Sequence, residues 1–306
     1  MTTIRTTAQQ AGNPVALAAR ALRRAVFAVS VLTDLDVRPA NLGITLPGSP
    51  AVWVSWGEVR GALAGHPADS VLGRARLADW LIARRWAADL PAEALAERVR
   101  LLGLPTGHAL HPGPAWTRSR VLGGALELGL GAVGLDPAHP DRVVPLPTAA
   151  LVGQPWAATG FPDRTDPTPG VGLLARAQAD LEQWGALAAE RTRLDPQGVL
   201  RPCGDADVVT LLGSRSLRSA LATAAGGLAA AVVPQRSRGW TRLSVVDAAF
   251  GPCAAAATAS AERGFPRPLL ITADEVALVP AGGRATGLLL RGPATADRSP
   301  RAVLYR

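Results

Sequence analysis

The chain contains no lysine, so all 32 of its basic residues are arginines. This absence excludes several mechanisms for the chain acting alone. A P-loop needs a lysine on the phosphates, a Schiff-base enzyme needs a lysine amine, and a protein kinase needs its strand lysine. A GC-rich coding sequence explains the arginine usage most simply. The formal net charge of +8 is therefore weak support for a nucleic-acid partner.

Cysteine and long apolar runs are also scarce. The two cysteines, Cys203 and Cys253, each follow a proline and are too few for a disulfide framework. They predict free thiols in a reducing, cytoplasmic compartment. No stretch reaches the 18 or more apolar residues of a membrane span, and no signal peptide is recognisable. We therefore expect a soluble protein without a membrane partner.

Metal and nucleophile signals are weak. His108, His111, His139 and Asp136 are ligand types for zinc, but they lie in Gly/Pro-rich loops without HExxH or CxxC spacing. No histidine follows His139, so neither cysteine has a nearby base in its own half of the chain. The sequence predicts no metal site and identifies no cofactor.

The composition that remains is typical of a folded protein. Hydrophobic residues make up 48% of 306 residues, which is enough for two domains of ordinary size. The stretch Gln154–Gly170 holds four prolines and two glycines without any periodicity. We interpret it as a linker, residues 154–170, between an α-rich domain at 1–153 and an α/β domain with a mixed sheet at 171–306. The expected fold class is mixed α and β.

Several elements follow from local patterns. Asn13-Pro14 predicts a helix start, Ser55 and Glu58 form a capping box, and an apolar stripe from Leu174 to Ala188 predicts a long helix. Two further helices are expected over Pro91–Leu102 and Ala115–Gly131. Helices are also expected near Ser216–Ala225 and Ala248–Glu262. The expected strands are Val143–Leu146, Val199–Pro202, Asp207–Leu212, Ala230–Val233, Thr241–Val246, Pro268–Thr272, Val276–Val279, Gly287–Arg291 and Ala302–Tyr305.

The first candidate site is the run Gly213, Ser214, Arg215, Ser216, followed by Arg218, between an apolar run and a helix. A helix N-terminus presents free backbone N–H groups and partial positive charge, and glycine, serine and arginine favour close approach of an anion. The same residues also fit an ordinary helix N-cap with a solvated arginine. A single glycine favours that second interpretation.

The second candidate is the run Arg236 to Arg242. If it is extended, Arg236, Arg238, Trp240 and Arg242 share one face of a strand. Guanidinium groups bind phosphates and an indole stacks on a base, so this face would suit an anionic partner. The alternative is an arginine-rich turn with Trp240 packed on the core and arginine stems over it.

Three functions remain open. The first is a non-catalytic binding or regulatory protein that engages nucleic acid or a phosphorylated ligand through the Arg/Trp face. The second is an enzyme acting on a phosphorylated or nucleotide-like molecule at Gly213–Ser216. The third is an assembly or scaffold protein. The sequence identifies no catalytic residue and no oligomeric state, and we prefer the first function.

Overall fold

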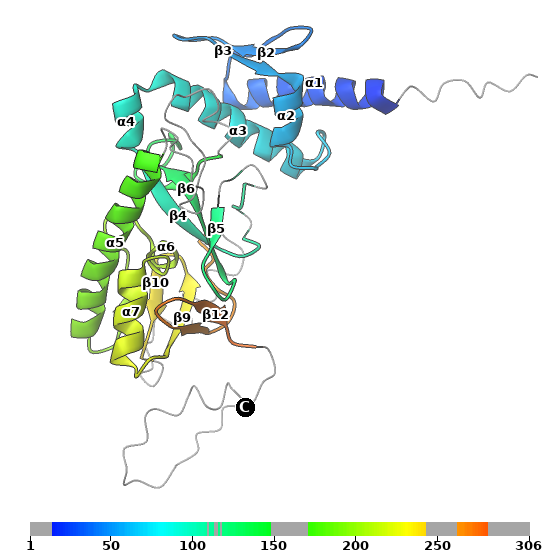
Figure 1. Cartoon of the computed structure of the whole chain (residues 1–306). Helices are drawn as coiled ribbons and strands as arrows, with labels where there is room; N and C mark the ends of the chain where they lie inside the picture. The colour runs from blue at the N-terminus through cyan, green and yellow to red at the C-terminus, as the bar shows by residue number, and fades with distance from the viewer. Residues whose placement is uncertain are drawn as a thin grey trace, which may run out of the picture. The chain divides into compact units, whose positions relative to one another are not determined.

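The computed structural model describes residues 14–108, 110–112, 116, 118–147, 171–242 and 262–280 (Figure 1). These residues form helices and antiparallel sheets, which confirms the mixed α and β class. The chain divides into two compact units that are not continuous in sequence. Unit 1 comprises Met1–Leu102, His111–Arg118 and Gly129–Ala177, and unit 2 comprises Gly103–Leu110, Ser119–Leu128 and Gln178–Arg306. The predicted linker, residues 154–170, lies wholly outside the described residues, so it stays a prediction.

Unit 1 begins with helices that local signals specify. They are α1 (Pro14–Thr33), α2 (Trp56–Ala62), α3 (Val71–Asp89) and α4 (Ala92–Ala96). The predicted capping box is confirmed, because Ser55 accepts from the backbone of Glu58 while the Glu58 carboxylate accepts from the backbone of Ser55. On α1, one stripe is buried and packs against α3; its members are Leu22, Ala25, Val26 and Val29.

The helix expected over Pro91–Leu102 is confirmed only in its first half, at Ala92–Ala96, and the helix expected over Ala115–Gly131 is wrong. After the short α4, the chain forms strand β4 (Val99–Pro105), and the span 115–131 holds strands β5 (Arg118–Arg120) and β6 (Leu126–Ala132). Every residue of β6 is buried. A strand buried on both faces shows no polar alternation, so its apolar run resembles that of a buried helix. The periodicity of the sequence could not distinguish the two.

Two sheets involve the first half of the chain. Strands β1 (Arg38–Pro39), β2 (Gly43–Leu46) and β3 (Val52–Ser55) form an antiparallel sheet in that order. The other sheet has the order β4-β6-β5, and β7 (Val144–Pro145) pairs antiparallel with β6. Backbone hydrogen bonds from Thr106 to Ala125 and from Val133 to Arg98 show that β4 and β6 run antiparallel.

Unit 2 contains a five-stranded sheet of order β12-β11-β9-β10-β8. Its strands are β8 (Val199–Leu200), β9 (Ala229–Gln235), β10 (Arg238–Trp240), β11 (Leu269–Ile271) and β12 (Val276–Leu278). All pairings among its described strands are antiparallel, in place of the expected mixed sheet. For β9–β10 and β11–β12 the reason is local, because short turns join these strands and impose antiparallel pairing.

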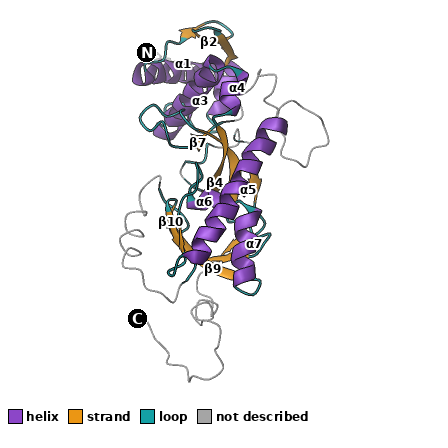
Figure 2. Ribbon diagram, turned by 90° about the vertical axis from the view of Figure 1, so that its left-hand side faces the viewer, coloured by secondary structure: helices purple, strands orange, loops and turns teal. Residues whose placement is uncertain are grey.

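The helices of unit 2 include one further correction. Asp207–Leu212, expected as a strand, forms the one-turn helix α6 (Val208–Leu211), whose N-cap Asp207 accepts from the backbone N–H of Thr210. The longer helices α5 (Val171–Leu194) and α7 (Arg215–Ala224) lie side by side in both views (Figures 1 and 2). The stripe predicted on α5 is confirmed for Leu174, Ala177, Leu181 and Ala188, which are buried, while its fifth member, Trp184, is half-buried.

Some expected elements remain untested. The strand at 241–246 is not observed at its first two residues, and the rest of that segment lies outside the described residues. The helix expected over 248–262 falls almost wholly outside them, and the strands expected at 287–291 and 302–305 do so completely.

Gly129 tests the packing of unit 1. A Cβ added at Gly129 would lie 2.1 Å from Cε2 of Trp116, whereas a Cβ at Gly61 would meet nothing within 4 Å. Gly129→Ala should lower the free energy of unfolding by about 1–3 kcal/mol, because an extra methyl in a packed core forces strain. Gly61→Ala, inside α2, should raise it by about 0.5–1 kcal/mol. Urea denaturation of both variants measures the difference, and equal stabilities would contradict this packing.

Candidate functional site

The N-terminus of α7 already holds an anion, and that anion belongs to the chain itself. The Glu182 carboxylate on α5 accepts hydrogen bonds from Ser214 Oγ at 2.9 Å and from the backbone N–H groups of Arg215 and Ser216, each at 2.8 Å. Ser214 is the N-cap, and its Oγ accepts from the backbone of Leu217. An external anion at this helix end would have to displace Glu182.

A glycine lets α5 and the start of α7 approach closely. A Cβ at Gly185, three residues after Glu182, would lie 1.9 Å from Ser214 Oγ. The glycine therefore brings α5 against the N-cap of α7. Gly213 lies instead against the side chain of Leu128, which fills the space beside it. Helix contact and core packing explain both glycines.

The Glu182 carboxylate is stabilised in its charged form. Burial acts to raise its pKa, but hydrogen bonds from Ser216, Arg215 and Ser214 outweigh burial and hold the pKa below the ordinary value of 4.5. A serine hydroxyl that donates to a carboxylate also resembles a nucleophile beside a base. However, Ser214 is 0% exposed, so no substrate reaches it. The arrangement is a structural cap.

Arg215 and Arg218 have different environments. Arg215 is exposed and pairs with Asp274 at 3.3 Å. Arg218 is 7% exposed and donates to the carbonyl oxygens of Leu212 at 2.8 Å, Gly213 at 2.7 Å and Ala273 at 3.1 Å. Burial lowers the pKa of Arg218. The guanidinium therefore connects α7 to the residues just before the helix and to Ala273.

Arg236 is likewise engaged inside the fold. Its side chain is 4% exposed, and its Nε and Nη2 donate to Oδ2 of Asp207 at 2.7 and 2.6 Å. The other oxygen of Asp207 accepts from the backbone of Thr210 at 2.7 Å, so one carboxylate both caps α6 and pairs with Arg236. The backbone of Arg236 also accepts from Val208. The pair therefore attaches the β9–β10 turn to α6.

His108, which the sequence singled out as a ligand type, is part of the same region of unit 2. Its Nε2 lies 3.0 Å from the carbonyl oxygen of Arg263, and its Nδ1 accepts from the backbone of Leu110. These partners fix the neutral tautomer that carries its proton on Nε2. Burial, and then the charge of Arg236, lower the pKa of His108. The ring therefore stays neutral and serves as a hydrogen-bonding link.

The second candidate face, formed by Arg236, Arg238, Trp240 and Arg242, does not lie on a single extended strand. Arg236 precedes β10, and Arg242 follows it. Arg238 and Trp240 do share a face, with the Arg238 guanidinium 5.3 Å from the centroid of the Trp240 ring. Trp240 is 3% exposed, which matches the alternative of a core tryptophan beneath an arginine. Arg242 is exposed, and its Nη1 donates to the carbonyl oxygen of Pro196 at 2.6 Å.

A groove between α5 and α7 brings two of the predicted residues together with others that sequence reasoning missed. It has a volume of about 560 Å³, which is within the range of ligand-binding pockets. Ser216 and Arg242 were predicted, and Arg193 and Glu190 were not. The lining comprises Ala186, Ala189, Glu190, Thr192, Arg193, Ser216, Ala220, Leu221, Ala224, Ala225, Ala229, Ala230, Thr241 and Arg242.

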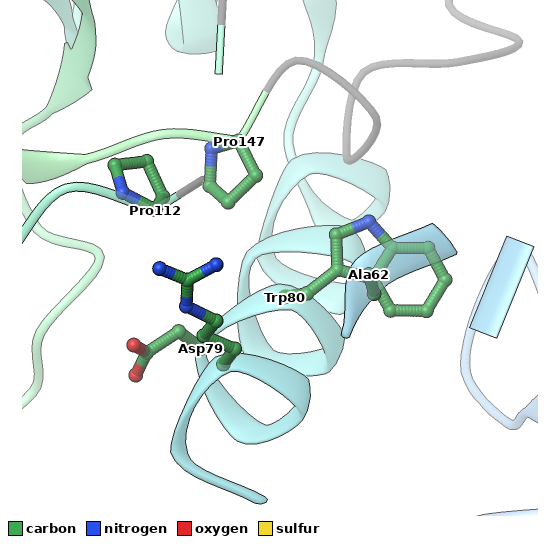
Figure 3. A pocket seen from close by; sticks show the side chains of 6 residues that line it. Ala62, Asp79, Trp80, Pro112 and Pro147 are labelled. Carbon is green, nitrogen blue, oxygen red and sulfur yellow. The ribbon is translucent and has the colours of Figure 1, made fainter. Parts of the chain in front are cut away.

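Unit 1 holds a much smaller pocket (Figure 3). Its volume of about 20 Å³ is close to the space needed by one water molecule, so it is too small for an organic ligand. Trp80 and Asp79 come from α3, while Pro112 and Pro147 close the opposite side. Trp80 Nε1 and Arg76 Nε have no hydrogen-bond partner in the described part of the chain. The pocket is a packing feature of unit 1.

Other site classes gain no support from the described residues. Among them, no three or more His, Cys, Asp and Glu side chains converge as metal ligands. His139 instead pairs with Asp136 at 3.2 Å. Cys203 is buried and free, and Cys253 lies outside the described residues. None of the described helices is long and apolar enough to cross a membrane.

Comparison of the chain with protein-family models, with curated proteins and with solved structures finds no match. The site is therefore interpreted from its geometry.

Glu182 should contribute to stability in a pH-dependent way. Glu182→Ala removes the acceptor of one hydroxyl and two backbone N–H groups, and should lower the free energy of unfolding by about 1–3 kcal/mol at pH 7. Because the folded pKa lies below the unfolded value of 4.5, the contribution of the charged carboxylate is present above that pH. It is lost as the pH falls through the folded pKa.

Urea denaturation of wild type and Glu182→Gln between pH 3 and pH 7 checks this sign. The difference should be constant near neutrality and shrink in acid. Glu190→Gln, on the exposed Glu190–Arg193 pair, is the control and should leave stability nearly unchanged. A difference that grows in acid would contradict the assignment.

Asp207 and Asp274 form a matched pair for testing which arginines are structural. Asp207→Ala leaves the buried Arg236 without its carboxylate and should cost about 3 kcal/mol or more. Asp274→Ala breaks only the exposed pair with Arg215 and should change the melting temperature little. Similar melting temperatures for the two variants would show that the Arg236–Asp207 pair is not a structural requirement.

Proposed function

We propose that the chain is a non-catalytic binding protein whose α5/α7 groove holds an elongated apolar ligand that carries one acidic group. The observation that carries the proposal is the groove itself, about 560 Å³ in volume, with an alanine-rich wall on each side and arginines on its rim. Sites of this size with apolar walls and a few convergent polar groups are typical of ligand binding.

The apolar character of the groove comes from small side chains that remain open to solvent. Ala186 on α5 and Ala220 and Ala224 on α7 are exposed although they line the groove. Exposed helix positions usually carry polar or charged residues, so a concentration of alanines on two facing helices is informative. Because each side chain ends at Cβ, the groove stays deep enough for an alkyl chain or a ring. Burying such a ligand gains roughly 25 cal/mol per Å² of apolar surface.

The acidic group of the ligand follows from the polar part of the lining. Arg242 follows β10 and is anchored by the carbonyl of Pro196, just beyond the end of α5, while Arg193 lies in the last turn of α5. Both guanidinium groups therefore lie at the same end of the groove. Glu190 offsets one of these charges, so the end carries a net charge of about +1. A carboxylate or a phosphate monoester would bind there through charge-assisted hydrogen bonds.

The remaining polar residues of the groove favour ligand binding over catalysis. Thr192 Oγ1 donates to the carbonyl of Ala188, and Thr241 Oγ1 donates to the carbonyl of Gly198. Both hydroxyls therefore have structural partners, and Glu190 is paired with Arg193. Among the residues that the structure describes, no histidine or cysteine lines the groove. A nucleophile paired with a base, as an enzyme would require, does not emerge from this set.

The groove is tested with dodecanoate, dodecyl phosphate and dodecanol as probes, by calorimetry. Dodecanoate or dodecyl phosphate should bind, and dodecanol should bind more weakly. Ala220→Phe should abolish binding by filling the groove. Arg242→Gln should weaken the acidic probes about tenfold, the effect of losing one charge-assisted hydrogen bond, and leave dodecanol unchanged.

Ala179→Phe provides the matched control, because Ala179 is exposed on α5 but does not line the groove. It should bind all probes like wild type. Saturable binding that persists in Ala220→Phe, or no binding of any probe to wild type, would refute the proposal.

A further inference from the structure

Helix α1 has a second face that stays exposed in the described part of unit 1. Leu17, Arg20, Arg24, Phe27 and Val31 follow one another at spacings of three, four, three and four residues, so they form one stripe along the helix. We refer to this stripe as the outer face of α1. All five residues are exposed, with Phe27 at 72% and Val31 at 67%. The stripe is opposite to the buried one that packs against α3.

The outer face carries two arginines between Leu17 and an apolar C-terminal half. Residues Pro14–Thr33 include no Asp or Glu, and no salt bridge joins Arg20 or Arg24 to an acidic residue in the described part of the chain. Both arginines lie in the N-terminal half of the stripe. Phe27 and Val31 occupy its C-terminal half, next to Leu32, which is 77% exposed. Exposed large apolar side chains in a contiguous group indicate an interaction surface.

A third arginine of α1, Arg23, contacts an aromatic ring beside the outer face. The guanidinium of Arg23 lies 5.5 Å from the centroid of the Trp56 ring, and Trp56 Nε1 donates to the carbonyl oxygen of Ala40. The aromatic ring therefore fixes a third positive charge beside Arg20 and Arg24. This contact orders Arg23 alone, and Arg23 adds to the positive potential around Arg20 and Arg24.

We propose that the outer face of α1 docks an acidic, amphipathic segment of a partner protein. Carboxylates of the partner pair with Arg20 and Arg24, and apolar side chains cover Phe27 and Val31. The charge selects the occupant, because complementary potentials favour association and like charges oppose it. A second copy of this chain would bring the same positive charges to the interface.

A lipid surface fits the arrangement less well. Interfacial helices keep their charged residues on the side opposite the inserted apolar residues. On α1, Arg20 and Arg24 point in the same direction as Phe27 and Val31, so insertion would take both guanidinium groups into the apolar layer. A protein partner can instead present carboxylates to one half of the stripe and an apolar pocket to the other.

The test is a selection from a display library of random 20-residue peptides against the full-length chain. Two variants, Arg20→Glu/Arg24→Glu and Phe27→Ser/Val31→Ser, remove the charge and the apolar contact separately. We expect enrichment of peptides that combine Asp and Glu with Leu or Phe at helical spacing. Binding of the enriched peptides should fall about tenfold or more in each variant and weaken with salt.

Two control variants distinguish binding at the outer face of α1 from nonspecific peptide binding. Arg60→Glu and Val71→Ser alter exposed residues elsewhere in unit 1 and should leave peptide binding unchanged. Because the substituted side chains are exposed, melting temperatures should match wild type. Neutral or basic enriched peptides, or binding that survives both double variants, would overturn the proposal.

Two further outcomes would also overturn it. One is binding to phosphatidylserine vesicles, but not to acidic peptides, that Phe27→Ser/Val31→Ser abolishes. The other is a dimer in sedimentation velocity that the same variant dissociates. Either result would assign the outer face of α1 to another occupant.

Discussion

The contact of Glu182 with the N-terminus of α7 determines the arrangement of the helices in unit 2. The carboxylate accepts hydrogen bonds from the Ser214 hydroxyl and from two backbone N–H groups. Such N–H groups have no partner within their own helix. Gly185 permits this contact by leaving room for Ser214 Oγ. Beyond the contact, the later turns of both helices border the groove. The proposed binding function therefore depends on this contact, which shares Ser216 with the groove.

Arginine performs much of the internal cross-linking of this lysine-free chain. Arg218 and Arg236 bond to carbonyl or carboxylate oxygens in unit 2, and Arg85 in unit 1 donates to the carbonyl oxygens of Leu46, Pro47 and Pro50. A guanidinium has five donors in a planar fork, so one side chain can satisfy several acceptors at once. Part of the net positive charge is therefore engaged inside the fold. This reduces the positive charge at the surface that an anionic partner could contact.

The exposed arginines are consequently the informative ones. Arg242 and Arg193 border an alanine-rich groove in unit 2, and Arg20 and Arg24 accompany apolar side chains on α1 in unit 1. In each case a positive charge is next to apolar surface that remains accessible. The two surfaces differ in shape, because one is a groove sized for a small molecule and the other is a ridge along a helix. We therefore assign them different classes of partner.

Local sequence signals determined those features that depend on nearby residues. The Ser55–Glu58 capping box, the stripe of α5 and the turn between β9 and β10 are all fixed within a few positions of the chain. Ser214 was correctly recognised as a possible N-cap, and Ser216 and Arg242 were among the predicted site residues that border the groove. Patterns failed where elements are buried on every side, as in β4, β6 and α6, because uniform burial removes the periodicity.

Only the tertiary structure decided that Glu182, 32 residues from Ser214, would supply the anion at α7, and that alanines from two helices and a strand would form one groove. Such long-range contacts leave no spacing in the sequence, since they depend on how separate elements pack.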